Sequence, residues 1–176
     1  MIEPVKGRGR DLYSLFAREV RAHASLSHPG IVAIHDHGQV DLEESEASLG
    51  ELAPGSPYLV MELATHGTLR DLLRDRPAPD YAAARGVLLD VLDALAHAHA
   101  RGVIHRDVKP ANILVTAIGE KNLHVKLKDF GIARALRESR GPESAILGTP
   151  AYMAPEQIAA EPKHLGPWTD LYAVGC

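Results

Sequence analysis

The first third of the chain carries one helical and two strand-like patterns of apolar residues. Residues 11–26 are predicted to form an amphipathic helix, because their apolar face recurs every three or four positions. That face comprises Leu12, Leu15, Phe16, Val20 and His23. The turn at 28–30, His-Pro-Gly, ends the helix, and strands are predicted at 31–37 and 58–63.

An acidic stretch, residues 40–56, separates the two predicted strands. It contains Asp41, Glu43, Glu44, Glu46 and Glu51 and no basic residue. Such a composition predicts a solvated loop without fixed structure. An acidic docking site is the alternative interpretation.

A short and a long helix follow, at 67–74 and 80–101. Asp80 suits the N-cap of the long helix, and Gly102 lies just past its end. The expected buried face holds Tyr81, Leu88, Val91, Leu92, Leu95 and His99.

The remaining elements are short. Strands are predicted at 113–115 and 124–127, with a turn at 117–122 between them. Residues 141–148 read as an exposed loop.

Composition and charge narrow the class of protein. The 176 residues, 45% hydrophobic and 24% charged, suffice for one core or for two small lobes that share a cleft. A net charge of −4 and a pI of about 6.2 argue against a nucleic-acid-binding surface. The single cysteine, Cys176, permits no internal disulfide, which suits the cytoplasm. Neither a signal peptide nor a membrane-spanning run is evident, so a membrane anchor of a longer parent protein would lie outside this sequence.

Two short segments gather the groups that phosphoryl transfer requires. Residues 105–112 read His-Arg-Asp-Val-Lys-Pro-Ala-Asn, and residues 129–131 read Asp-Phe-Gly. They supply a carboxylate to accept a hydroxyl proton, an ammonium to neutralise phosphate, and hard oxygen ligands for Mg²⁺. The same strings are signature segments of protein kinases. From about Leu12 to Cys176, the chain resembles a eukaryotic-like (Hanks-type) bacterial serine/threonine protein kinase.

The resemblance implies an α+β, two-lobed protein-kinase-like fold of which this chain holds a part. Residues 1–63 would form the rear of the small sheet lobe, with a helix like kinase αC and two strands. Residues 64–176 would form the front of the helical lobe: the catalytic loop, the activation segment and the start of helix αF. The implied activity is ATP- and Mg²⁺-dependent phosphorylation of Ser/Thr hydroxyls on protein substrates.

The resemblance also assigns roles in catalysis. Asp107 would be the catalytic base, and Lys109 would neutralise charge on the γ-phosphate. Asn112 and Asp129 would bind Mg²⁺. Of these, the lysine is typical of Ser/Thr kinases rather than Tyr kinases.

A nucleotide site is implied by matching positions. Met61 would be the gatekeeper, Glu62 and Leu63 would belong to the hinge that binds adenine, and Leu114 would lie under the purine. Met61 and Leu114 are equally compatible with ordinary core packing. Glu19 would pair with a lysine that grips the phosphates.

Regulatory roles are implied for the segment between Asp129 and Glu156. Arg106 would pair with a phosphate added to Ser139 or Ser144, although both can also be plain loop serines. Thr149, in the stretch that ends at Glu156, would bond the catalytic Asp and Lys and support the peptide-binding loop.

Three further positions are expected to be structural. His105 would pack beside Phe130, and Asp170 would anchor the backbone of the catalytic loop. The pairs of neighbouring histidines, at 35 and 37 and at 97 and 99, lack the spacing and cysteine partners of zinc sites.

The N-terminal region departs from the family pattern. No Gly-x-Gly-x-x-Gly precedes the first helix, and Lys6 follows Pro4 and lies close to Glu19 for the expected lysine. We therefore expect a kinase domain cut at both ends, and activity of these residues alone stays open. The rival interpretations are a non-catalytic kinase-like module that binds nucleotide or a partner, and a small-molecule phosphotransferase. The segment 148–156 favours protein substrates over small molecules.

Overall fold

The computed structural model describes residues 8–49, 51–75, 79–118, 123–130, 150–159 and 161–176. The helices are α1 (Arg8–Ala24), α2 (Leu42–Ala47), α3 (Leu69–Asp75), α4 (Tyr81–His99), α6 (Pro155–Ile158) and α7 (Pro167–Gly175). The strands are β1 (Ile34–Gln39), β2 (Pro57–Met61), β3 (Ile113–Ile118) and β4 (Leu123–Leu127). Short 3-10 turns are η1 (Pro110–Asn112), η3 (Pro150–Tyr152) and η4 (Pro162–His164). Within these residues, none of the helices is long and apolar enough to cross a membrane.

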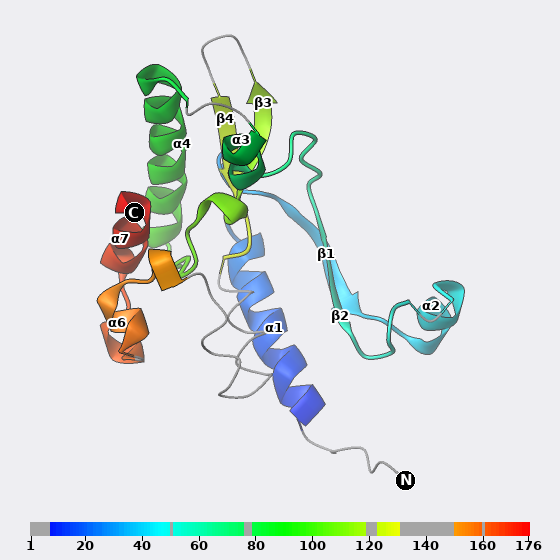
Figure 1. Cartoon of the computed structure of the whole chain (residues 1–176). Coiled ribbons are helices and arrows are strands. Elements are labelled where there is room, and N and C mark those ends of the chain that lie inside the picture. Colours follow the sequence, from blue (N-terminus) through cyan, green and yellow to red (C-terminus); the bar gives the residue numbers. More distant parts are fainter. Residues whose placement is uncertain (1–7, 50, 76–78, 119–122, 131–149, 160) are drawn as a thin grey trace.

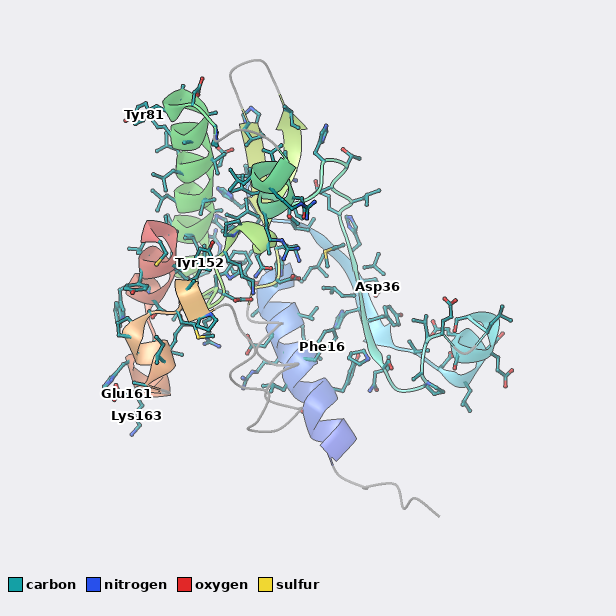
Figure 2. The ribbon with its side chains drawn as sticks, in the orientation of Figure 1. Phe16, Asp36, Tyr81, Tyr152, Glu161 and Lys163 are labelled. Atoms are coloured by element: carbon teal, nitrogen blue, oxygen red, sulfur yellow. The ribbon has the colours of Figure 1, made fainter. Side chains whose placement is uncertain are left out.

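The first hairpin, β1 and β2, is antiparallel and packs against α1. Opposite pairs include Gly38 with Tyr58, and the register shifts near Ile34. Phe16 and Val20 of α1 are buried against the hairpin. Figure 2 shows Phe16 on the side of α1 that faces the strands, and Figure 1 shows the hairpin extending away from the rest of the molecule, with α2 at its far end.

The second hairpin, β3 and β4, packs on α4 and carries the larger core. Leu114 lies opposite Lys126 in the antiparallel register. Val115, Val125 and Leu127 are buried together with the α4 residues Val91 and Leu95. This arrangement places the end of β4 beside the segment that follows α4.

A short backbone junction joins the two hairpins. Val32 N–H donates to the Leu127 carbonyl (2.9 Å), and Leu127 N–H donates to the Gly30 carbonyl (2.8 Å). Because Ile31 bridges to Leu127 instead of pairing with β2, β1 begins at Ile34, later than the predicted strand. The chain after α1 therefore hydrogen-bonds to β4 before it enters β1.

The acidic stretch contains a helix, so the prediction of a loop without fixed structure was wrong. Asp41 caps α2 by accepting from Glu44 N–H (2.7 Å), and Glu44 accepts from Asp41 N–H (2.9 Å). This reciprocal capping box satisfies two backbone donors that would otherwise need water. Ser45 is buried and donates to the Leu52 carbonyl (2.7 Å).

The long helix has the predicted cap and most of the predicted face, since Val91 and Leu95 are buried as expected. Asp80 accepts from Ala83 N–H (2.8 Å), and Gly102 adopts φ +73°, which confirms both end signals. Tyr81, however, is 84% exposed and points outward from the end of α4. Leu88 is also exposed.

Three residues smaller than Tyr81 and Leu88 complete the buried face of α4. Val87, Ala94 and Ala98 are buried instead. Close packing explains the choice, since a Cβ at Gly30 would lie 3.2 Å from the Ala94 Cβ. A large side chain at Ala94 would therefore separate α4 from the junction.

Candidate active site

The loop after α4 is held by one buried carboxylate. Asp170, at the start of α7, is 1% exposed. Its oxygens accept from the backbone N–H groups of His105 (2.8 Å) and Arg106 (2.7 Å), and Oδ2 lies 2.7 Å from His99 Nε2. Arg106 has φ +68°, a left-handed conformation that is costly for a side-chain-bearing residue. The bonds from Asp170 stabilise this turn.

His105 joins the two candidate catalytic loops in its neutral form. Asp107 N–H donates to Nδ1 (3.3 Å), so Nε2 carries the hydrogen that is donated to the Lys128 carbonyl (2.9 Å). Burial lowers the pKa of His105, in agreement with this neutral tautomer. Its ring also packs on Phe130 at 4.5 Å between centroids.

Three candidate catalytic side chains meet at the carboxylate of Asp107. Lys109 Nζ lies 2.9 Å and 2.8 Å from its two oxygens. Asn112 Nδ2 donates to Oδ2 of Asp107 (3.0 Å) and to its carbonyl (2.8 Å). The η1 turn makes this possible because it brings residue 112 back toward residue 107.

Asp129 lies on the adjacent loop, two residues after the end of β4. Lys128 N–H donates to the Asn112 carbonyl (3.0 Å), which ties the two loops together. Asp129 itself has φ +64° and forms an ion pair with Lys128 (Nζ to Oδ2, 2.6 Å). The four residues with predicted chemical roles therefore lie on two loops that are directly hydrogen-bonded.

The oxygen atoms of this site fit Mg²⁺. Both of the hydrogen bonds that the Asn112 carboxamide makes to Asp107 use Nδ2, so Oδ1 is its atom suited to a cation. Asp129 supplies a carboxylate. Mg²⁺ typically takes one or two protein oxygens and completes its octahedron with water and phosphate. No group of three or more His, Cys, Asp or Glu able to hold a metal occurs in the described part of the chain.

The predicted nucleotide residues lie along the join between the hairpins. Met61, half-buried, ends β2 opposite Ile34. Glu62 forms an ion pair with Lys126 of β4 (2.7 Å), and this hydrogen bond lowers the pKa of Glu62. Leu114 lies opposite Lys126 in the β3–β4 register. Lys126 therefore connects Leu114 with the hinge candidate Glu62. Leu63 is 86% exposed, so only its backbone could serve a buried ligand.

Glu19 does not meet a lysine among the described residues. Its carboxylate is partly buried and pairs with Arg18 Nη2 at 3.2 Å. Lys6, the weak candidate partner, lies outside the described residues.

The segment after residue 149 contacts the catalytic loop directly. Gln157 Nε2 donates to the Arg106 carbonyl (2.8 Å), while its Oε1 accepts from Ala154 N–H (3.0 Å). Glu156 accepts from the Thr169 hydroxyl (2.6 Å), and this bond lowers the pKa of Glu156. Ser139, Ser144 and Thr149 lie outside the described residues.

Sequence reasoning missed three residues that contact this site. Gln157 and Lys128 carried no signal beyond their proximity to known motifs. His99 was placed on the buried face of the long helix, but its partner, 71 positions away at Asp170, was not foreseeable from spacing. Periodicity reports which side of a helix is buried and not what meets it.

Comparison with known proteins identifies the family. The chain is 41% identical over 172 residues to the serine/threonine-protein kinase PknB of Mycobacterium leprae, and 40% identical over 173 residues to PknB of Mycolicibacterium smegmatis. Each alignment covers 96% of this chain and 25% of the relative, so the chain spans about a quarter of the length of these curated relatives.

Solved structures agree with the curated relatives. A crystal structure of the Mycobacterium tuberculosis PknI kinase domain, a cysteine-to-alanine mutant, matches with a TM-score of 0.66 and 28% identity, over 96% of this chain and 57% of that one. The shared fold is thus a mixed helix-and-sheet kinase fold, of which this chain covers a part. The family model described as the protein kinase domain matches residues 5–176, and the chain therefore belongs to the protein kinase family.

Proposed function

We propose that the protein containing this chain transfers the γ-phosphate of ATP to serine or threonine hydroxyls of protein substrates, with Mg²⁺. One observation carries the proposal. Lys109 and Asn112 both hold the Asp107 carboxylate, while the backbone of Asn112 bonds to the residue before Asp129. A base, a cation and two oxygen ligands are thus assembled on adjacent loops.

The roles of the four residues follow from their chemistry. Asp107 accepts the proton of the attacking hydroxyl as the new bond to phosphorus forms. Lys109, which orients that carboxylate, is long enough to turn toward the γ-phosphate and neutralise developing charge. Asn112 and Asp129 hold Mg²⁺, which when bound neutralises the phosphate oxygens. Positioning and charge stabilisation account for most of the catalysis in this reaction class.

Adenine would bind where the two hairpins join. The Glu62–Lys126 ion pair supports this assignment, because it connects the end of β2 to β4, the strand that pairs with β3 at Leu114. Met61, Glu62 and Leu63 would form the gatekeeper and hinge. In this proposal residues 1–63 belong to the small lobe and residues 64–176 to the large lobe, and the site lies on the cytoplasmic side, where ATP is available.

Regulation by phosphorylation is the proposed role of Arg106. Its Nε is buried and makes no hydrogen bond within the described part of the structure, and guanidinium groups donate strong hydrogen bonds to phosphate oxygens. Ser139 and Ser144 are the proposed sites of modification, with Thr149 supporting the peptide-binding loop. Such a phosphate would act on the residue next to the catalytic base.

The activity is tested with a generic protein substrate, Mg·ATP and mass spectrometry for phosphoserine and phosphothreonine. We expect Asp107→Asn to lower the rate by about 10²- to 10⁴-fold, because the base is lost while the side-chain size is kept. Asp129→Ala is expected to abolish turnover. Lys163→Met, in the exposed η4 turn, is the matched control and should keep full activity.

The two rival functions predict different results in the same assay. Label that appears only on a small metabolite would identify a small-molecule phosphotransferase. A specific ATP complex with no transfer, unchanged by Asp107→Asn, would identify a non-catalytic module. The Arg18–Glu19 pair favours the non-catalytic module, since it engages the carboxylate that kinases pair with lysine.

A further inference from the structure

Lys128 is a cation placed directly on the candidate metal ligand. Its Nζ lies 2.6 Å from Oδ2 of Asp129, and the two side chains are only 23% and 22% exposed. The neighbouring lysines are engaged elsewhere: Lys109 with Asp107 and Lys126 with Glu62. Among the described lysines of these two loops and β4, Lys128 is therefore the one that contacts Asp129.

The backbone of Lys128 is fixed on both sides. Its N–H donates to the Asn112 carbonyl (3.0 Å), and its carbonyl accepts from His105 Nε2 (2.9 Å). Consecutive side chains of a strand normally point to opposite faces. The left-handed backbone of Asp129 (φ +64°) departs from this rule, and the two neighbouring side chains meet. The ion pair is thus a product of the loop geometry and not a chance contact of two mobile surface side chains.

An ammonium and a divalent cation cannot share this carboxylate without cost. Lys128 contacts Oδ2, and a divalent cation on either oxygen of the same carboxylate would lie close enough to the ammonium for the two charges to repel each other in a partly dehydrated site. Lys128 must leave Asp129, or loosen its bond, when a divalent cation enters. The free energy of that step weakens cation binding.

We infer that Lys128 is a counter-cation of Asp129 that competes with a divalent cation for its carboxylate. The inference rests on the proposed function in one respect, namely that Asp129 binds the metal. Displacement leaves the ammonium without its partner beside the proposed polyphosphate site, where phosphate oxygens can replace the carboxylate. Loading of metal and nucleotide would therefore favour each other.

The test is a titration of the full chain with Mn²⁺ alone, followed by electron paramagnetic resonance of the free ion. Lys128→Met removes the competing charge and should lower the apparent Kd for Mn²⁺ by about threefold to tenfold, the range expected for one charge-assisted contact of intermediate burial. Lys128→Arg keeps a cation and should stay close to wild type. Lys163→Met removes the same charge far from the site (Figure 2) and should leave the Kd unchanged. Lys128→Gln serves if the methionine variant fails to fold.

The outcomes separate the inference from the proposed function. Tighter Mn²⁺ binding in Lys128→Met, lost again when Asp129→Asn is added, supports both. Equal or weaker binding in Lys128→Met, with loss in Asp129→Asn, overturns the counter-cation role and leaves the metal site standing. Binding that survives Asp129→Asn, or that is absent from wild type and from Lys128→Met alike, overturns the inference together with the metal role of Asp129.

Discussion

Asp170 carries a negative charge in the interior of the protein, and hydrogen-bond donors of other residues surround this carboxylate. Two backbone N–H groups and His99 contact its oxygens, and one of these N–H groups belongs to the left-handed Arg106. A buried carboxylate is tolerated when such bonds replace its hydration. The same bonds hold the conformation of the loop that carries Asp107.

We expect Asp170→Ala to lower the free energy of unfolding by about 3–5 kcal/mol, because it leaves buried donors unsatisfied and removes support for a strained turn. Urea denaturation followed by circular dichroism measures the change. Asp170→Asn keeps one acceptor oxygen and should cost less. Equal stability of the alanine variant would contradict the anchoring role.

His23 is a buried histidine whose ring contacts Phe130 at 5.1 Å between centroids. Nε2 lies 3.0 Å from the Val32 carbonyl, and Nδ1 is buried without a hydrogen bond in the described part of the chain. Burial lowers the pKa of His23 from 6.5 to about 4. Phe130 lies between two such histidines in the contact network, since it also packs on His105.

The depressed pKa predicts loss of stability in mild acid. The unfolded chain takes up a proton at His23 below about pH 6.5, whereas the folded protein takes it up only near pH 4. Protonation therefore favours the unfolded state between these values. The free energy of unfolding is unaffected by His23 above pH 6.5 and decreases as the pH falls from 6.5 toward 4. For His23 alone the loss between pH 7 and pH 5 is about 2 kcal/mol. The lowered pKa of His105 acts in the same direction.

Urea denaturation at these two pH values, with His23→Gln as the comparison, isolates the contribution of this histidine. Gln retains a donor for the Val32 carbonyl but does not titrate. The difference in unfolding free energy between pH 7 and pH 5 should shrink by about 2 kcal/mol in this variant. An unchanged difference would show that the ring is not held neutral.

Among the helices, α4 shows how well capping signals at both ends locate an element. Asp80 and Gly102 marked the limits of α4 because capping chemistry acts within a few residues. The same local chemistry at Asp41 and Glu44 was outweighed by the acidic composition, and α2 was missed. The buried face of α4 was predicted in part: Val91 and Leu95 are buried as expected, whereas Ala94 and Ala98 are buried in place of Tyr81 and Leu88.

Asp80→Ala is expected to destabilise the protein by about 1 kcal/mol, because the Ala83 N–H loses its side-chain acceptor. Thermal and urea denaturation measure the effect, and Asp80→Asn should restore most of the stability. Glu43→Ala, on the exposed side of the short α2 helix, provides a control with loss of the same charge. A loss as large in that control would attribute the effect to net charge instead of to the cap.

Contacts between distant segments hold the whole molecule together. The junction of Gly30 and Val32 with Leu127, and the Glu62–Lys126 pair, connect the two hairpins around the proposed adenine site. A ligand that binds across this join should stabilise the folded state by mass action.

Mg·ADP at about 100 times its Kd is expected to add about 2.7 kcal/mol and to raise the melting temperature by roughly 5–10 °C. Differential scanning fluorimetry with and without EDTA measures the metal-dependent part. Asp129→Asn should lose that part and keep the response to nucleotide alone. The absence of any shift across the nucleotide titration would contradict the proposed site.

Local signals were sufficient to locate the candidate site and most of the elements. The spacing of Asp107, Lys109 and Asn112 within one turn, the caps of α4 and the alternation along β4 all act over a few residues, so they can be read along the chain. The pairing of distant groups depended on packing: Asp170 reaches His105 across 65 positions, and His23 reaches Phe130 from the first helix. Even the contact between adjacent Lys128 and Asp129 depends on the left-handed backbone of Asp129, because side-chain direction follows backbone conformation and not residue type.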